Sequence, residues 1–308
     1  PPKQSYFMSL PPTYEALQQP SHTFGQYNEA NEDDFEWAKE WMDSVGDVPS
    51  EPHRLSHSAE RDIAAYGCKL YNLLPPPTDG SMRDRFQGNV VHPPKCAYGT
   101  TEVVTKRGCK DVCMLSNFPL HFGLYDRSSL RGVYYEITIE VMKGVIALGM
   151  TPLPFPQFRL PGWERGIGLH FDDMRIFLLD DKGGRDLEDR RPRKALDDDE
   201  RLKGQVFGCG YDYSRNTVFY TMNGKRLQDE FNATSTYIQY DIYAAVGVSG
   251  REGMHWSSEE NKFTVNFGGE DFVWKEANVD NWCRRSEGSF HVVGMPTADL
   301  PKYTERAE

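Results

Sequence analysis

The sequence predicts an all-β fold, and the stretch from residue 204 to 231 carries most of that prediction. Residues 206–211 alternate with a period of two, and residues 217–222 are mainly β-branched and aromatic, which is typical of strands. Ser214-Arg215-Asn216 separates them, and Asn223-Gly224 favours a type I′ hairpin turn. Three strands with two tight turns form a β-meander. A content of 13% aromatic residues with 27 glycines also suits a sheet core with many turns.

The composition narrows the classes of function. The 308 residues could form one large or two small domains. A net charge of −11, without a basic block, argues against nucleic-acid binding. No apolar run approaches the ~20 residues that a membrane helix needs. The chain opens with Pro1 rather than methionine, which leaves open an upstream segment that includes a membrane anchor.

The six cysteines are irregularly spaced and do not indicate a disulfide framework, so we expect reduced intracellular thiols. Cys109 and Cys113 lack the further partners of a structural zinc site. No secretory signal is visible. His53 and His57 lie four residues apart, but without the glutamate or third ligand of a zinc enzyme. We therefore expect no metal, no cofactor and no catalytic site, and a protein that binds rather than catalyses.

The first 53 residues are rich in Pro, Gln, Asn, Ser and acidic residues, a composition with little independent core. Within them, Leu10-Pro11-Pro12-Thr13-Tyr14 contains a PPxY motif. Paired prolines favour polyproline II, which WW domains bind in an aromatic-lined groove. The motif predicts a WW-domain ligand formed by Leu10, Pro11, Pro12 and Tyr14. The alternative is an unused proline-rich tail.

A short helix is predicted within residues 28–45. Phe35, Ala38, Met42 and Val45 recur at helical spacing, and acidic residues occupy the first turn. We expect this helix to pack on the sheets, with a partner-binding helix as the alternative. Residues 53–67 predict a second short helix that ends at Gly67.

Strand-like segments follow from residue 89 onwards: 90–91, 100–105, 112–115, 132–142 and 145–151. In 132–142, Tyr135, Ile137, Ile139 and Val141 form one apolar face, which predicts a strand with one buried side. Residues 152–163, PLPFPQFRLPGW, contain four prolines and therefore predict a structured surface loop. The acidic and basic stretch 180–203 lacks the pattern of a calcium loop, and we expect a solvated, mobile insertion.

The order of these segments resembles the SPRY domain, an antiparallel β-sandwich that binds peptides and proteins. The resemblance covers roughly residues 95–274 and rests on five strands: GVYYEI at 132–137, IALGMT at 146–151, VFYTMNG at 218–224, IYAAVG at 242–247 and FTVNF at 263–267. It implies a SPRY-type sandwich at 89–282, a proline-rich and partly helical N-terminal extension at 1–88, and a C-terminal tail at 283–308.

Two further segments narrow the resemblance to a fungal subgroup. TPLPFPQFRLPGW at 151–163 and VNFGGEDFVWKEANVDNW at 265–282 resemble SPRY adaptors of a WW-domain HECT ubiquitin ligase, which sort membrane proteins through endosomes to the vacuole. Their upstream transmembrane helix is not in this chain, and IGLH at 167–170 replaces their "S-V/I-A-Y" strand. The resemblance implies an intracellular, cytosolic protein, or one at the cytosolic face of endosome or vacuole membranes.

The chain closes with Leu300-Pro301-Lys302-Tyr303, an L-P-x-Y variant of the same motif, so Leu300, Pro301 and Tyr303 form a second predicted WW ligand. Two ligands on one chain would raise the apparent affinity for tandem WW domains.

Residues on the loops of a rigid sandwich usually carry recognition. The predicted protein-binding residues are Tyr125, Asp126, Arg127, Arg159, Trp163 and Tyr211. Trp163 and Tyr211 could instead only pack the core. The alternative function is a scaffold subunit of a multiprotein assembly, like the Ran-binding-protein SPRY scaffolds of another ubiquitin ligase. An enzyme with an unrecognised site is a third class.

Overall fold

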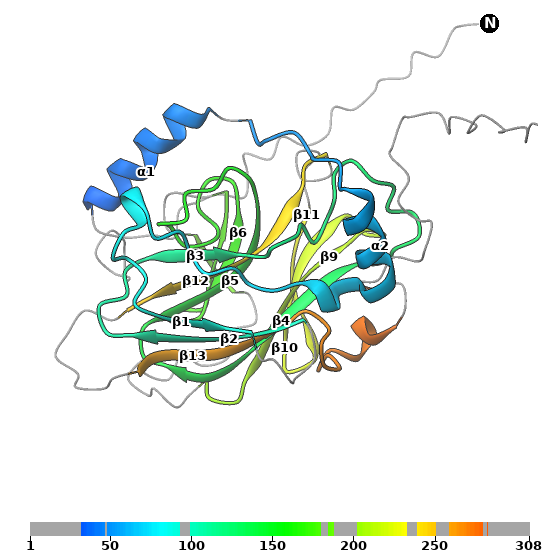
Figure 1. Ribbon diagram of the computed structural model, residues 1–308. Helices are drawn as coiled ribbons and strands as arrows, with labels where there is room; N and C mark the ends of the chain where they lie inside the picture. The colour runs from blue at the N-terminus through cyan, green and yellow to red at the C-terminus, as the bar shows by residue number, and fades with distance from the viewer. Residues whose placement is uncertain are drawn as a thin grey trace, which may run out of the picture.

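Two antiparallel sheets pack face to face in the computed structural model (Figure 1). The structure describes residues 32–46, 48–92, 99–179, 184–187, 202–232, 239–250, 259–279 and 282. Both PY motifs and most of the 180–203 insertion lie outside these residues. The helices are α1 (Glu32–Val45) and α2 (His57–Tyr66), with short 3-10 turns at Gly67–Leu70, Gly80–Met82 and Lys275–Asn278.

Within the described ranges, seven strands form the first sheet, in the order β1-β2-β13-β4-β9-β10-β11. Six described strands form the second, in the order β3-β12-β5-β6-β7-β8. The strands are β1 (Gly88–Val91), β2 (Thr100–Lys106), β3 (Val112–Leu115), β4 (Gly132–Met142), β5 (Val145–Pro152), β6 (Ile167–His170), β7 (Arg175–Leu178), β8 (Arg185–Asp186), β9 (Val206–Asp212), β10 (Thr217–Met222), β11 (Lys225–Asn232), β12 (Ile242–Ser249) and β13 (Glu259–Asn266). This architecture confirms the predicted antiparallel β-sandwich. The last two strands lie inside the sheets, β13 between β2 and β4 and β12 between β3 and β5.

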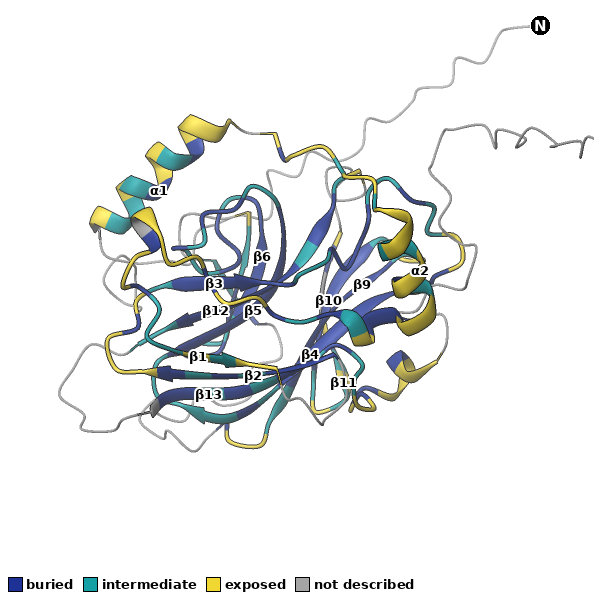
Figure 2. Ribbon diagram, in the orientation of Figure 1, coloured by how far each residue is buried: buried dark blue, intermediate teal, exposed yellow. Residues whose placement is uncertain are grey.

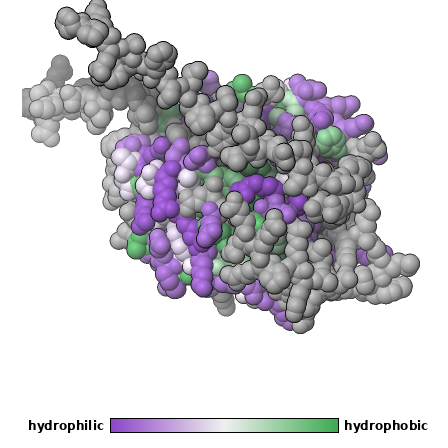
Figure 3. Space-filling view, turned by 180° about the vertical axis from the view of Figure 1, so that it is seen from behind, coloured by the Kyte–Doolittle hydropathy of each residue, from purple (hydrophilic) through white to green (hydrophobic). Residues whose placement is uncertain are grey.

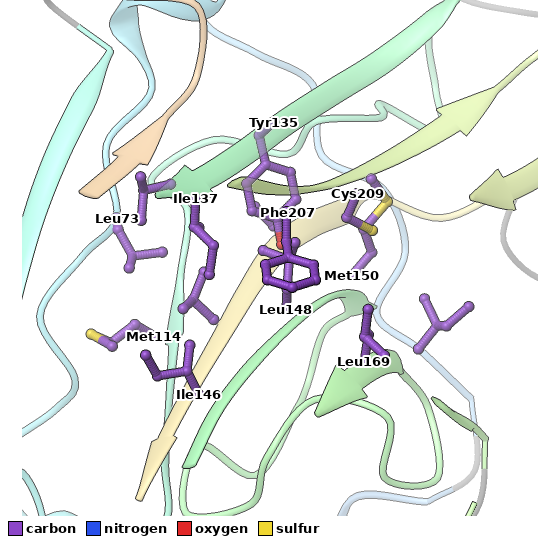
Figure 4. Close-up of a cluster of buried hydrophobic side chains, with 14 of the residues drawn as sticks. Leu73, Met114, Tyr135, Ile137, Ile146, Leu148, Met150, Leu169, Phe207 and Cys209 are labelled. Atoms are coloured by element: carbon purple, nitrogen blue, oxygen red, sulfur yellow. The ribbon is translucent and has the colours of Figure 1, made fainter. Parts of the chain in front are cut away.

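The main core fills the space between the sheets, where the central strands are largely buried, whereas edge strands such as β1 and β8 are partly exposed (Figure 2). Alternate residues of β4 and β9, among them Tyr135, Ile137 and Phe207, face Leu148 and Met150 of β5 (Figure 4). The Tyr135 hydroxyl group reaches across the core, where it donates its hydrogen bond to the Gly149 carbonyl oxygen of the second sheet and lies 3.1 Å from the Ala245 carbonyl oxygen. A buried phenol therefore joins the two sheets without leaving a polar atom unpaired.

The predicted meander is confirmed as β9, β10 and β11. Asn223 and Gly224 have φ of 49° and 74°, the two positive values of a type I′ turn. Gly210 of β9 lies beneath the ring of Phe219, and a Cβ atom there would lie 2.6 Å from Phe219 Cε1. Gly208 and Gly210 therefore leave room for aromatic side chains, because a Cβ atom at either position would collide with Tyr134 or Phe219.

The prediction of one buried face for β4 was wrong for its first half. Tyr134 is 0% exposed and Glu136 is 3% exposed, although both point away from the core between the sheets. The C-terminal segment covers them: an aromatic layer of Tyr134, Phe219, Phe272, Trp274 and Trp282 packs on this outer face. Glu136 accepts hydrogen bonds from the Val273 main-chain nitrogen at 2.9 Å and from the Tyr134 hydroxyl group at 3.0 Å.

Both predicted helices are present, and α1 packs on the sandwich as expected. Ala38 and Met42 of α1 are buried in the main core cluster, whereas Val45 at its end is exposed. The Trp37 ring stacks on Phe158 with 3.7 Å between centroids. In α2, the Ser56 side chain caps the first turn, and Gly67 with φ of 59° ends the helix.

The predicted loop at 152–163 is structured, and its apolar side chains point inwards. Phe155 packs with Cys113, Leu115 and Ala245 on the outer face of the second sheet. The four cysteines among the described residues are buried thiols outside any disulfide. On the face of the molecule turned away in Figure 1, the coloured residues are mainly hydrophilic, with small hydrophobic areas between them (Figure 3).

Candidate functional site

Arg127 and Tyr211, two of the predicted binding residues, meet at one end of the sandwich. Arg127 Nη1 donates a hydrogen bond to the Tyr211 hydroxyl oxygen at 3.1 Å, and that hydroxyl group donates to Asn216 Oδ1 at 2.8 Å. The Arg127 guanidinium also lies 5.3 Å from the centre of the Tyr213 ring, a cation–π distance. These residues, with His121, form a group that we call the loop cluster.

His121, Tyr213 and Asn216 are members of the loop cluster that sequence reasoning missed. His121 Nδ1 lies 3.0 Å from the Tyr213 hydroxyl oxygen, and its ring meets both tyrosine rings edge-on. Tyr213 follows Tyr211 by two residues, and the period of a strand places both on one side. That spacing was the available signal. Nothing in the sequence near His121 indicates that it joins the cluster, because it lies about ninety residues before Tyr213 in the chain.

The side chains of the loop cluster differ in what they offer to a partner. Tyr211 is 0% exposed, and burial raises the pKa of its phenol, which therefore stays neutral. Arg127, Tyr213 and Asn216 are only partly buried. Asp126 accepts hydrogen bonds from the Ser128 nitrogen and hydroxyl group, which fixes the turn that presents Arg127. An arginine on a fixed turn, beside a partly exposed tyrosine ring, is suited to protein recognition.

Tyr125 lies at the same end but is covered by the N-terminal segment. Its side chain is 2% exposed. Its hydroxyl group accepts a hydrogen bond from the Leu55 nitrogen and donates one to Glu60 Oε1, each at 2.8 Å. Burial and the neighbouring Glu60 carboxylate raise the pKa of Tyr125 to about 12. The prediction that Tyr125 binds a partner stays a prediction, since its contacts are within the chain.

Comparison with known proteins identifies the fold family. Residues 132–269 match the family model described as the SPRY domain. The chain contains a SPRY domain. Such a domain is a protein-interaction module, which matches the geometry of the loop cluster.

Several fungal proteins are similar to this chain around the SPRY domain. "Protein ssh4" of Sclerotinia sclerotiorum is 28% identical over 176 residues, which is 56% of this chain and 28% of that protein. "Protein ssh4" of Aspergillus fumigatus is 32% identical over 155 residues, 49% of this chain and 26% of that protein. "SPRY domain-containing protein C285.10c" of Schizosaccharomyces pombe is 27% identical over 181 residues, 57% of this chain and 38% of that protein. The chain thus spans much less than two thirds of the length of these relatives.

Solved structures of SPRY domains are also similar to this chain. The crystal structure of a human SPRY domain covers 59% of this chain and 96% of that chain, with 21% identity and a TM-score of 0.37. The SPRY domain of human HERC1 covers 55% of this chain and 84% of that chain, with 11% identity and a TM-score of 0.29.

Arg159 and Trp163 lie elsewhere on the SPRY domain, in the 152–163 loop beneath α1. Trp163 is 5% exposed, and the Arg159 guanidinium lies 5.8 Å from its ring centre. Arg159 Nη1 is 3.9 Å from Asp111 Oδ2. Burial lowers the pKa of Arg159 and raises that of Asp111, opposite to the effect of their mutual attraction. The structure thus divides the six predicted binding residues between two places, and their role in binding stays a prediction.

His170 is held in its neutral form by the same loop. Burial lowers the pKa of His170 to about 4, and its Nε2 lies 3.0 Å from the Pro161 carbonyl oxygen. Since a carbonyl only accepts, Nε2 carries the proton and donates it. Among the described residues, no group of three or more His, Cys, Asp or Glu could hold a metal ion. No helix within the described ranges is long and apolar enough to cross a membrane.

The partly buried Asp172 gives a test of the electrostatics of the SPRY domain. Asp172 Oδ1 is buried and has no hydrogen-bond partner among the described residues, and burial raises the pKa of Asp172 from 3.8 to about 6. Asp172 holds its proton more tightly in the folded than in the unfolded state, so its protonated form stabilises the fold. This stabilisation is fully present below about pH 4 and is lost as the pH rises through about 6. We expect Asp172→Asn to stabilise the protein by about 2 kcal/mol at pH 7 and to have little effect at pH 4.

Urea denaturation at both pH values measures this difference. Asp173→Asn is the matched control, because the Asp173 carboxylate already accepts a hydrogen bond from the Arg175 nitrogen at 3.1 Å. An Asp172→Asn protein no more stable than the wild type at pH 7 would show that Asp172 is not penalised by burial.

Proposed function

We propose that this protein is a non-enzymatic adaptor that brings a ubiquitin ligase to a bound target. In this proposal, residues 89–282 form the binding domain, and the extensions at 1–88 and 283–308 recruit a WW-domain HECT ligase through Leu10–Tyr14 and Leu300–Tyr303. One observation carries it: a SPRY domain and a PPxY sequence occur in the same chain. The loop cluster offers Arg127 and Tyr213 to the target.

The finer role is sorting of membrane proteins. Its support is the resemblance of residues 151–163 and 265–282 to fungal adaptors of this type, together with fungal relatives named "Protein ssh4". The target would be ubiquitinated at the cytosolic face of endosome or vacuole membranes, with this protein reaching the membrane through an anchor outside this chain.

Titration with a purified tandem WW module tests the recruitment. We expect Tyr14→Ala combined with Tyr303→Ala to weaken binding by at least about tenfold, or about 1.4 kcal/mol, because each tyrosine fills the ligand groove. Tyr6→Ala combined with Tyr27→Ala is the control, since both tyrosines lie in the N-terminal segment but belong to neither the PPxY nor the LPxY motif. Isothermal titration calorimetry measures all three proteins.

Two outcomes would contradict the ligase proposal. Equal binding by the wild type and the double variant would mean that the motifs are not the ligands. Absence of binding to either would leave the SPRY domain as a scaffold subunit, the second class considered. Co-purification of a stable assembly that survives loss of both motifs favours that scaffold.

A further inference from the structure

The segment between α1 and α2 crosses the loop end of the sandwich as an extended strap (Figure 1). We call residues 48–56 the N-terminal arm. The arm contains neither helix nor strand. Its main-chain nitrogens bind to the sandwich: Ser50 N donates to the Leu153 carbonyl oxygen at 2.7 Å, and His53 N donates to Asp241 Oδ2 at 3.0 Å. Leu55 N donates to the Tyr125 hydroxyl oxygen, as described above.

Every third residue of the arm is buried or partly buried against the sandwich. Pro49 is buried, and Pro52 and Leu55 are partly buried, whereas the other residues of the arm are exposed. A period of three is that of polyproline II, which also suits a P-x-x-P sequence. Ser56, at the end of the arm, has φ of −70° and ψ of 151°, close to the values of that conformation. The arm therefore contacts the sandwich as a P-x-x-P-x-x-L peptide.

The sandwich orients the acceptors that receive the arm. Asp241 Oδ1 accepts from the Gly123 nitrogen at 2.9 Å, which leaves Oδ2 directed at the arm. The Tyr125 hydroxyl group donates its proton in a hydrogen bond to Glu60, so its oxygen is available to accept a hydrogen bond from the Leu55 nitrogen. Leu55 itself packs against the cluster of Ile63, Phe122 and Tyr125. A carboxylate, a phenol oxygen and a carbonyl thus form a row of acceptors beside an apolar contact.

The interaction does not depend on the identity of most arm residues. Any residue except proline has a main-chain N–H that can make the three hydrogen bonds. The side chains that contact the sandwich are those of Pro49, Pro52 and Leu55. A segment held mainly by its backbone, with most of its side chains in solvent, opens more easily than a packed strand. Another peptide with the same spacing could make the same contacts.

We propose that Leu153, Asp241 and Tyr125 form a binding site for polyproline II peptides of the type P-x-x-P-x-x-aliphatic, and that the arm is its resident, displaceable ligand. The proposal deepens the proposed function, on which it rests for the view that this end of the SPRY domain holds a target. The tethered arm competes at the high effective concentration of an intramolecular ligand. A target peptide binds when the arm has opened.

Fluorescence anisotropy with a labelled synthetic peptide of residues 46–57 tests this site on the full chain. We expect Pro49→Ala combined with Pro52→Ala to bind the probe about tenfold more tightly than the wild type, because the internal competitor is weakened. Pro75→Ala combined with Pro77→Ala is the matched control, since these prolines are exposed and outside the arm. Adding Tyr125→Phe to the arm variant removes one acceptor and should weaken probe binding again.

Hydrogen exchange on the wild-type protein provides a second measurement that needs no variant. Excess unlabelled peptide should speed the exchange of the Ser50, His53 and Leu55 amides, because the displaced arm loses its acceptors. Equal probe affinity of the wild type and the arm variant, or no binding and no change in exchange at millimolar peptide, would overturn the proposal. Neither experiment involves a WW module, so its failure is distinguishable from failure of ligase recruitment.

Discussion

Asp212→Ala is expected to destabilise the sandwich by about 3–5 kcal/mol, because it leaves Arg226 without its carboxylate partner. Asp212 ends β9 and is 1% exposed. Its carboxylate accepts from Ser214 N at 3.1 Å, from Ser214 Oγ at 2.6 Å and from Arg226 Nη1 at 2.9 Å. The group therefore joins the turn after β9 to β11. Urea denaturation of both proteins at pH 7 gives the difference in unfolding free energy.

The lowered pKa of Asp212 also predicts how the destabilisation by Asp212→Ala depends on pH. Burial alone would raise the pKa of Asp212, but hydrogen bonds from Ser214 and Arg226 outweigh it, and the pKa falls below 3.8. Its contribution to stability is present above the unfolded pKa and is lost as the pH falls through the lower folded value. The Asp212→Ala penalty should thus shrink below about pH 4.

Asp126→Ala is the control for Asp212. Asp126 also accepts from the nitrogen and hydroxyl group of the serine two residues later, but it is only partly buried. We expect a loss of about 1 kcal/mol or less. Similar losses for the two variants would mean that the buried arginine contact adds nothing.

Gly210→Ala is expected to destabilise the protein by about 3 kcal/mol through overpacking. The new Cβ would lie 2.6 Å from Cε1 of Phe219, closer than atoms can approach. Phe219 is 0% exposed and is held on its other sides by Trp274 and by the Arg226 guanidinium, 3.7 Å from its ring centre. The ring therefore has little room to move. Thermal and urea unfolding both measure the loss.

A double-mutant cycle shows whether this close approach is the cause. Phe219→Leu creates space above residue 210, so the combination with Gly210→Ala should lose less stability than the sum of the two single losses. We expect a favourable coupling of about 1 kcal/mol or more. If the two losses simply add, the destabilisation by Gly210→Ala comes from its effect on the backbone and not from a clash with Phe219.

Local sequence patterns predicted the strands and turns of this fold well because short-range chemistry decides them. The Asn223-Gly224 turn, the strand at 132–142 and the helix end at Gly67 agree with the structure. The same patterns could not show that Tyr134 and Glu136 are buried. Their cover comes from Phe272 and the residues that follow, more than a hundred positions later. In the sequence, only the glycines of β9 indicated that aromatic side chains pack on the outer face of the first sheet.

The candidate site was predicted less completely, for the same reason. The sequence indicated Arg127 and Tyr211, and the structure places the two side chains in contact. It could not show that the arm covers Tyr125 or that α1 packs over the loop containing Trp163, because both contacts join segments far apart in the chain. Whether these residues bind a partner stays a prediction. The PPxY and LPxY motifs lie outside the described residues.

The positions of β12 and β13 determine when the chain can fold during synthesis. β2 and β4 become neighbours of β13 only after residues 259–266 have been made, and β3 and β5 must wait for residues 242–249. At roughly 5–20 residues per second, the earlier strands remain with unpaired edges for several seconds or more on the ribosome. Closure is then non-local and slow. A premature stop before residue 242 would remove a central strand from each sheet, so the nascent domain depends on its last strands and on protection from aggregation until they emerge.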